Sequence, residues 1–152
     1  MSEEFHVMSE SEFLNQQLTP HFKRSEFACK CRKNGKAYCS PIHANPDPRL
    51  AEMCEIIRQY IDKPITINSG CRCKQWNAAN KGASDSAHMY GFAADLSCAI
   101  GGKALFVAIQ DLYKAGKIPN LRYCLYYVRK DFCHVDIDVN KKRSQVFATT
   151  NS

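Results

Sequence analysis

The segment 131–139 constrains the fold most, because its side chains alternate in character. The apolar members of the alternation are Cys133, Val135, Ile137 and Val139. Successive side chains of a β-strand point to opposite faces of its sheet, so the pattern predicts a strand whose apolar face lies in the core. The opposite face then holds Phe132, His134, Asp136 and Asp138. That face either lines a cleft or meets solvent at the edge of the sheet, and the strand alone leaves both alternatives open.

Two amphipathic helices accompany this strand. Residues 48–61 carry apolar side chains at helical spacing, with Asp47 suited to the N-cap and Pro48 to the first turn. Residues 103–115 show the same periodicity and end before a glycine. Further strands are predicted at 63–68, 92–98 and 121–128. This order predicts an α+β fold, in which two main helices pack on a small antiparallel sheet.

The chain is long enough for one domain with its own core, and we place that domain at residues 21–140. A polar segment at 1–20 precedes it, and a polar, frayed tail at 141–152 follows it. The acidic N-terminus predicts no secretory signal peptide, so synthesis in the cytoplasm is expected. Apolar runs fall short of the ~20 residues that span a bilayer, so we expect no membrane insertion. We also expect a monomer.

A second polar signal lies in the segment 86–95, which reads Ser-Ala-His-Met-Tyr-Gly-Phe-Ala-Ala-Asp. It places His88 in a loop and Asp95 in an apolar, strand-like context. A buried carboxylate is costly unless it is paired or bound to a metal. The alternative is an aspartate that accepts hydrogen bonds from turn amides. Glycine and alanine between the two residues let the backbone pass close to a bound ion.

His88, Asp95 and His134 together are a sufficient ligand set for one catalytic zinc ion, which keeps a fourth position for water. Such chemistry needs a general base near that water. Asp131 lies three residues before His134, at a predicted hairpin, and is the candidate base. Its alternative role is to stabilise the turn through a hydrogen bond to the backbone.

The chain has nine cysteines, and this odd number leaves at least one of them unpaired. Without a signal peptide, a full disulfide framework is not expected. Cys29, Cys31 and Cys39 form a cluster that lacks the paired C-x-x-C spacing of structural zinc sites. A second metal site, a local disulfide and free thiols therefore all stay open. Cys71 or Cys73 is a further candidate, as a competing ligand for the first metal.

The pattern S-x-H-x-x-G-x-A-x-D followed by D-x-x-H-x-D resembles the zinc D,D-peptidases of peptidase family M15. This family includes D-Ala-D-Ala carboxypeptidases, dipeptidases of vancomycin resistance and phage L-alanyl-D-glutamate endolysins. Residues 67–72 and 21–29 also resemble family segments, so the likeness spans roughly residues 20–140. It implies the α+β zinc-peptidase fold that is also seen in the Hedgehog signalling domain.

The resemblance also implies roles for individual residues. His88, Asp95 and His134 match the zinc ligands, and Asp131 matches the catalytic carboxylate that passes a proton from the attacking water to the leaving amine. Arg72 matches the arginine that holds the substrate carbonyl or the developing oxyanion. Ser86 would support the site, and Asp136 would orient a ligand histidine. The chain departs from the family at Cys71, where an aromatic residue is usual, and at Cys133, where proline is common.

The resemblance implies a zinc metallopeptidase that cleaves peptidoglycan stem peptides or cross-links. The expected source is a phage or prophage lytic enzyme, acting on the cell wall after its release. The bond stays open among L-Ala–D-Glu, D-Ala–D-Ala and D-Ala–diaminopimelate. One alternative is a non-catalytic wall-binding module on the same fold. Another is a cysteine-based zinc protein that binds nucleic acid, which the net charge of +6 would suit but which lacks a concentrated basic face. We therefore expect no nucleic-acid partner.

Overall fold

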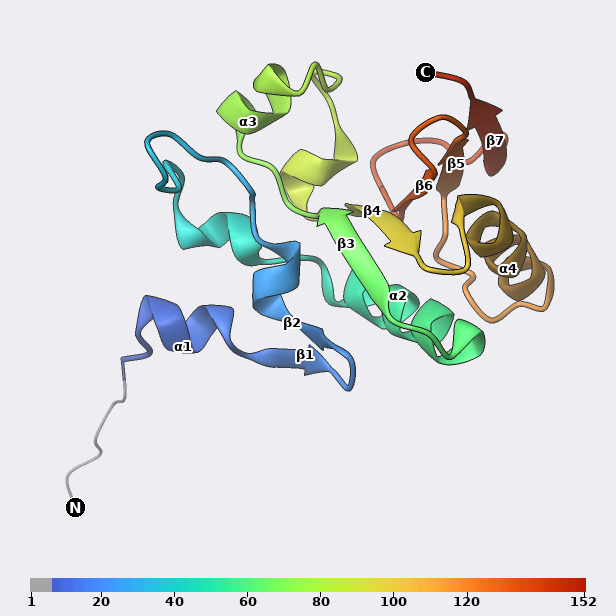
Figure 1. Cartoon of the computed structure of the whole chain (residues 1–152), viewed down its shortest axis with the longest axis horizontal. Helices are drawn as coiled ribbons and strands as arrows, with labels where there is room; N and C mark the ends of the chain where they lie inside the picture. The colour runs from blue at the N-terminus through green and yellow to red at the C-terminus, as the bar shows by residue number, and fades with distance from the viewer. Residues whose placement is uncertain (1–6) are drawn as a thin grey trace.

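A five-stranded sheet in the order β3-β4-β6-β5-β7 forms the centre of this computed structural model, which describes residues 7–152 (Figure 1). Its strands are β3 (Ile65–Ser69), β4 (Ala93–Cys98), β5 (Tyr123–Tyr127), β6 (Phe132–Asp136) and β7 (Phe147–Thr150). A separate two-stranded sheet pairs β1 (Gln17–Thr19) with β2 (Phe22–Lys23). This architecture confirms the predicted α+β class. The part of the 1–20 segment before residue 7 lies outside the described residues.

Helices of very different length join the strands. The α-helices are α1 (Glu10–Leu14), α2 (Pro48–Ile61), α3 (Lys74–Ala79) and α4 (Gly102–Lys114). Short 3-10 helices lie at η1 (Arg24–Phe27), η2 (Pro41–Ala44) and η3 (Ala87–Tyr90). The two long helices, α2 and α4, are those that the periodicity predicts. None of the helices within residues 7–152 has the length and apolar character needed to cross a membrane.

The ends of α2 follow the predicted capping. Asp47 accepts a hydrogen bond from the backbone N–H of Arg49 at 2.9 Å, and Pro48 occupies the first turn. Leu50 and Ile57 are fully buried against the sheet, where each contributes about 1.5–3 kcal/mol through loss of apolar surface from water. The helix ends at Ile61, and its C-cap residue, Asp62, has a φ of 56°. Together with α4, which contacts β4, β5 and β6, α2 encloses the main hydrophobic core.

Strand parity in β6 matches the prediction, and it separates the core from the functional face. Cys133 and Val135 lie in the core, whereas His134 and Asp136 lie on the opposite face with the side chains that line a groove. The predicted strand is too long at its C-terminal end, because β6 ends at Asp136. Val139 is consequently 59 % exposed and not part of the core.

The C-terminal tail also differs from the prediction. Residues 147–150 form β7, which pairs with β5 in parallel, so the sheet is mixed and not wholly antiparallel. Phe147 holds β7 against the domain, because its ring packs edge-on against Phe106 and Tyr113 of α4. The backbone N–H of Cys124 also donates to the carbonyl of Val146 at 2.7 Å. These long-range contacts order a segment whose local composition is polar.

Glu55 of α2 fastens the β1–β2 hairpin to the domain. Its carboxylate accepts a hydrogen bond from the backbone N–H of His21 at 2.7 Å, and its second oxygen lies 2.7 Å from Nδ1 of the same residue. Gln59 donates a further bond at 3.0 Å. Burial raises the pKa of Glu55, but these hydrogen bonds outweigh burial and lower the pKa to about 2. Glu55 is therefore a buried anion whose partners come largely from the N-terminal part of the chain.

Candidate metal centre

Three elements bring the predicted ligands together. His88 comes from η3, Asp95 from β4 and His134 from β6. Asp95 and His134 are direct partners in the antiparallel pairing of β4 with β6. One ligand atom from each of the three residues lies within 4.8 Å of the other two. Oδ1 of Asp95 lies 3.2 Å from Nε2 of His88 and 3.2 Å from Nδ1 of His134.

Hydrogen bonds on the far side of each ring fix which nitrogen faces the centre. Nδ1 of His88 donates to the carbonyl oxygen of Gly70 at 2.7 Å, so Nε2 is left with its lone pair. Nε2 of His134 lies 2.8 Å from Oδ2 of Asp136, so Nδ1 is the atom that faces Asp95. A carboxylate or carbonyl behind a histidine is the usual support for a metal-ligating ring.

The centre attracts positive charge. Burial raises the pKa of Asp95, but the imidazoles of His134 and His88, when protonated, lie 3.2 Å from its Oδ1 and hold the pKa below its usual range. Burial lowers the pKa of His134, but Asp136 and Asp95 at its two ring nitrogens raise it to about 9. The two carboxylates that favour a proton on His134 equally favour a metal cation between the three side chains.

The spacing of these atoms fits zinc. Ligands about 2.0–2.1 Å from a tetrahedral zinc ion lie about 3.3 Å from one another. The two distances from Oδ1 of Asp95 are both 3.2 Å. Two imidazole nitrogens and one carboxylate oxygen are also a donor set that zinc accepts. The residues present therefore fit a zinc ion that keeps one position open.

Asp136 is held by a residue that the sequence analysis missed. Arg122 donates to both oxygens of Asp136, from Nε at 2.7 Å and from the terminal nitrogen at 2.7 Å. Asp136 is 1 % exposed, so its charge needs such a partner. A series of side-chain hydrogen bonds from Arg122 to Asp136 and from Asp136 to His134 thus orients one predicted ligand. A buried aspartate needs a cationic partner, but the sequence does not show which of the basic residues takes that place.

Arg72 lies beside the predicted metal ligands, in contact with Asp95. Its guanidinium donates to Oδ2 of Asp95 at 3.2 Å and, from Nε, to Ser69 at 2.9 Å. A third bond goes to Asn77 at 3.3 Å, which the sequence analysis did not single out. The backbone N–H of Arg72 donates to the carbonyl of His88 at 2.9 Å. Arg72 is therefore a rigidly held cation at the edge of the ligand set.

Ser86 supports the site through the backbone. Its hydroxyl oxygen accepts a hydrogen bond from the N–H of His88 at 3.3 Å and so caps the 3-10 helix η3. This helix ends at Gly91, which has a φ of 73° that favours glycine. A Cβ atom at Gly91 would also lie 2.8 Å from the carbonyl oxygen of Asn45. The small residues of the motif thus set the turn that presents His88.

Comparison with known proteins agrees with this geometry. The family described as Peptidase M15 matches residues 20–136 of the chain. The chain belongs to the peptidase M15 family. A relative, the zinc D-Ala-D-Ala carboxypeptidase of Streptomyces albus G, is 54 % identical over 68 residues, which are 45 % of this chain and 27 % of the relative. The chain therefore spans about a quarter of the length of that relative. The match confirms the predicted family.

The M15 chain departs from the prediction at Asp131. Its carboxylate accepts hydrogen bonds from the N–H of Gly102 at 2.9 Å and the hydroxyl of Tyr126 at 3.1 Å. Gly102 begins α4, which covers the core face of the sheet, so Asp131 points away from the face that carries His134. The reason lies in the hairpin, where Asp131 has a φ of 58°. The structure thus brings Asp131 to the start of α4 and not to the ligand set.

A groove of about 540 Å³ surrounds the three ligands of this M15 domain. Six lysine and arginine side chains line it, namely Lys30, Arg72, Lys81, Arg122, Lys130 and Lys141. Its acidic lining among the described residues consists of Asp95 and Asp136, both already engaged. Aromatic side chains complete the walls, namely Trp76, Tyr123, Tyr127 and Phe132. Arg72, Arg122 and Lys141 already pair with aspartates. The groove therefore offers its remaining lysines and flat apolar surfaces to an anionic ligand.

Proposed function

We propose that this chain is a zinc-dependent peptidase that hydrolyses a peptide bond in peptidoglycan stem peptides or their cross-links. One observation carries the proposal: Nε2 of His88, Nδ1 of His134 and Oδ1 of Asp95 face one another, and each residue is held from behind. A zinc ion bound there would polarise the scissile carbonyl and lower the pKa of a water molecule. The Streptomyces relative is named as a zinc enzyme, which supports this cofactor.

The side chains around the ligands define what the protein itself contributes. Arg72 is fixed by Ser69, Asn77 and Asp95, so its charge is available to a substrate carbonyl oxygen without reorganisation. Asp136 keeps the proton of His134 on Nε2, so that Nδ1 stays free as a ligand. The low exposure of Asp95, at 7 %, keeps water away from one side of the centre.

The charge of the groove supports the class of substrate. Stem peptides carry free carboxylates, and Lys30, Lys81 and Lys130 line the groove in addition to the cations that pair with aspartates. Such complementarity raises the local concentration of an anionic substrate and aligns it. The activity in the name of the Streptomyces relative makes D-Ala–D-Ala the first bond to test. The L-Ala–D-Glu and D-Ala–diaminopimelate bonds are the other candidates, and a phage or prophage lytic enzyme that meets the wall after release is the proposed biological setting.

Defined muropeptides that contain each of the three bonds test the proposal. Products are identified by mass spectrometry for the zinc-loaded protein, for the chelated protein and for protein reloaded with zinc. We expect one bond to be cut, activity to disappear on chelation, and zinc to restore it. His134→Ala should abolish cleavage, whereas His43→Ala, which changes a histidine outside the ligand set, should leave it intact. Cleavage that survives complete metal removal would overturn the proposal, and binding without products would support the non-catalytic alternative.

A further inference from the structure

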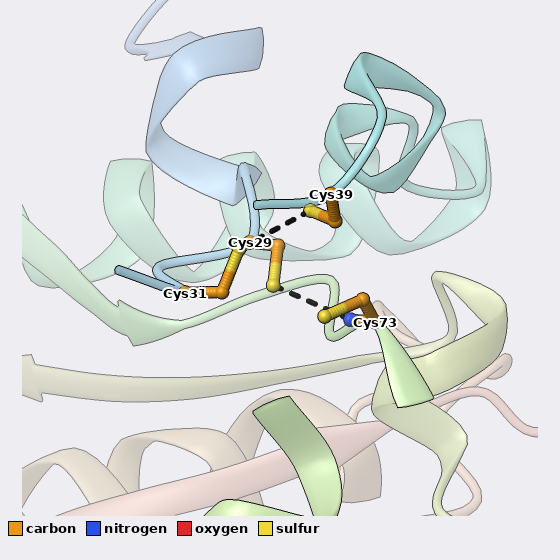
Figure 2. A group of neighbouring side chains, drawn as sticks. All are labelled: Cys29, Cys31, Cys39 and Cys73. Carbon is orange, nitrogen blue, oxygen red and sulfur yellow. Dashed lines mark hydrogen bonds between the residues drawn. The ribbon is translucent and has the colours of Figure 1, made fainter. Parts of the chain in front are cut away.

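Four cysteines from two distant parts of the chain converge at one point (Figure 2). Cys29, Cys31 and Cys39 come from the segment between η1 and η2, and Cys73 immediately precedes α3. Their four sulfur atoms all lie within 4.8 Å of one another. Cys29, Cys31 and Cys73 are buried, and Cys39 is partly buried. Cys29, Cys31 and Cys39 are neighbours in the sequence, whereas Cys73 joins them only in the fold.

The cluster is unlike an ordinary hydrophobic core. It is separate from the main core, and the one other apolar side chain packed against it among the described residues is Trp76. Small satellite cores normally hold aliphatic or aromatic groups, which bury more apolar surface than thiols do. A group of four sulfur atoms with almost no aliphatic neighbours is therefore better explained by a ligand of the sulfur atoms.

Backbone N–H groups point at three of the four sulfur atoms. The N–H of Cys73 donates to Sγ of Cys29 at 3.3 Å, and the N–H of Tyr38 donates to Sγ of Cys31 at 3.4 Å. The N–H of Trp76 donates to Sγ of Cys73 at 3.4 Å. Hydrogen bonds of this kind stabilise negative charge on sulfur, which is the form that binds a metal.

The loop between Cys31 and Cys39 is built to return the chain. Lys33 and Lys36 form an isolated antiparallel bridge, and the residues between them, Asn34 and Gly35, have φ values of 54° and 79°. This tight turn brings Sγ of Cys31 and Sγ of Cys39 to 3.4 Å. Between Cys29 and Cys39 the chain has four basic residues and no acidic one, which suits a site that carries net negative charge.

We propose that Cys29, Cys31, Cys39 and Cys73 bind a second, structural zinc ion. Sulfur ligands about 2.3 Å from a tetrahedral zinc lie about 3.8 Å apart, which matches a cluster whose sulfur atoms lie within 4.8 Å of one another. The ion would join residues 28–40 to the segment that carries Arg72, directly before Cys73. It would thereby hold the N-terminal loop against the wall of the groove. No residue is shared with the His88 set, so the inference does not depend on the proposed function.

Zinc content tests the proposal directly. Full-length protein purified under reducing conditions should contain about two zinc ions per chain. The double variant Cys31→Ser/Cys39→Ser and the double variant His88→Ala/His134→Ala should each fall to about one. Cys98→Ser is the matched control, because Cys98 packs against the main core, and it should keep about two. A zinc content that is the same in the wild type and in the Cys31→Ser/Cys39→Ser variant would overturn the proposal, whatever the occupancy of the His88 set.

Cobalt gives a second measurement, and its wild-type titration does not depend on whether the variants fold. Metal-free, reduced wild-type protein titrated with Co²⁺ should develop the strong thiolate-to-cobalt charge-transfer absorption of a site with four sulfur ligands. The His88→Ala/His134→Ala variant should retain this absorption, and the Cys31→Ser/Cys39→Ser variant should lose it. A wild-type spectrum without charge-transfer absorption would overturn the proposal. So would a disulfide between Cys31 and Cys39 in protein that contains one zinc.

Discussion

Asp95 and His134 lie directly opposite each other on neighbouring antiparallel strands, and their facing atoms, Oδ1 and Nδ1, are 3.2 Å apart. Because the register of a sheet is fixed along the whole strand, this pair is as rigid as the backbone hydrogen bonds of β4 and β6. The third ligand, His88, is supplied by a short helix that is tied to the sheet through Gly70. The centre is thus preorganised before any metal binds.

Asp136→Asn should weaken zinc binding by about 10–100-fold, because asparagine can accept the hydrogen bond of His134 but carries no charge. Competition with a chromogenic chelator measures the Kd. Asp111→Asn changes an exposed aspartate of α4 and is the control. An unchanged Kd in Asp136→Asn would show that the support of His134 does not matter for metal binding.

Arg122→Met should destabilise the fold by about 3 kcal/mol, because it leaves the buried carboxylate of Asp136 without its cation. Denaturant unfolding gives this value. The double variant Arg122→Met/Asp136→Asn should lose less than the sum of the single variants, by about 0.5–3 kcal/mol. Strict additivity would contradict a direct coupling between the two side chains.

Arg72→Lys should lower kcat/KM by about 100-fold. Lysine keeps the charge but lacks the planar, forked donors with which arginine reaches Ser69, Asn77 and Asp95 together. Zinc content should stay near that of the wild type, since the metal ligands are unchanged. Parallel measurement of zinc and of muropeptide turnover separates the two effects. A proportional loss of zinc and turnover would show that Arg72 acts only by holding Asp95.

Asp131→Ala should cost about 1 kcal/mol of stability, as expected for loss of a side chain that caps the first turn of a helix, here α4. Zinc and turnover should be retained, because the carboxylate points to the core face of the sheet. Thermal unfolding measures the loss of stability, and muropeptide cleavage measures the retained turnover. Complete loss of turnover in a folded, zinc-loaded variant would contradict this role and support the catalytic role that the family resemblance implies.

The spacing of apolar residues predicted those elements of the fold whose structure depends mainly on residues close in sequence. The helices α2 and α4 follow from apolar periodicity and capping, and the two faces of β6 follow from alternation. The strand β7 was missed, because it depends on pairing with β5 and on the contact of Phe147 with α4. Its own segment has no pattern strong enough to indicate a strand.

The candidate site likewise combines residues that sequence motifs reveal with residues that only tertiary contacts reveal. His88, Asp95 and His134 belong to compact motifs and were predicted together, and the structure brings them together. Arg122 was not singled out, and Cys73 was named only as a competing ligand for the first metal, because both meet their partners through tertiary contacts. The structure gives Asp131 the backbone contact of its alternative role, at Gly102 N–H, and its catalytic role stays a prediction. Its position three residues before His134 suggested the same cleft, but a positive φ at the hairpin turns its side chain toward α4. Backbone conformation at one residue thus decided the direction of a functional group.

Glu55 gives the protein an acid-sensitive contact that is separate from the metal centre. Its pKa in the folded state is about 2, below the ordinary value of 4.5, so the folded state favours the carboxylate. The contribution to stability is therefore complete above about pH 5 and is lost as the pH falls from 4.5 toward 2. Glu55→Gln should reduce the free energy of unfolding by about 1.5–3 kcal/mol at neutral pH, the usual strength of hydrogen bonds to a charged group.

The difference between wild type and Glu55→Gln isolates this contact from other groups that titrate in acid. Denaturant unfolding at a series of pH values should show a large difference at pH 7 and a difference that shrinks toward zero near pH 2. Glu52→Gln is a suitable control, because it changes an exposed glutamate of the same helix. A difference that stays constant across this range would mean that the charge of Glu55 does not hold the N-terminal hairpin, and that its packing alone does.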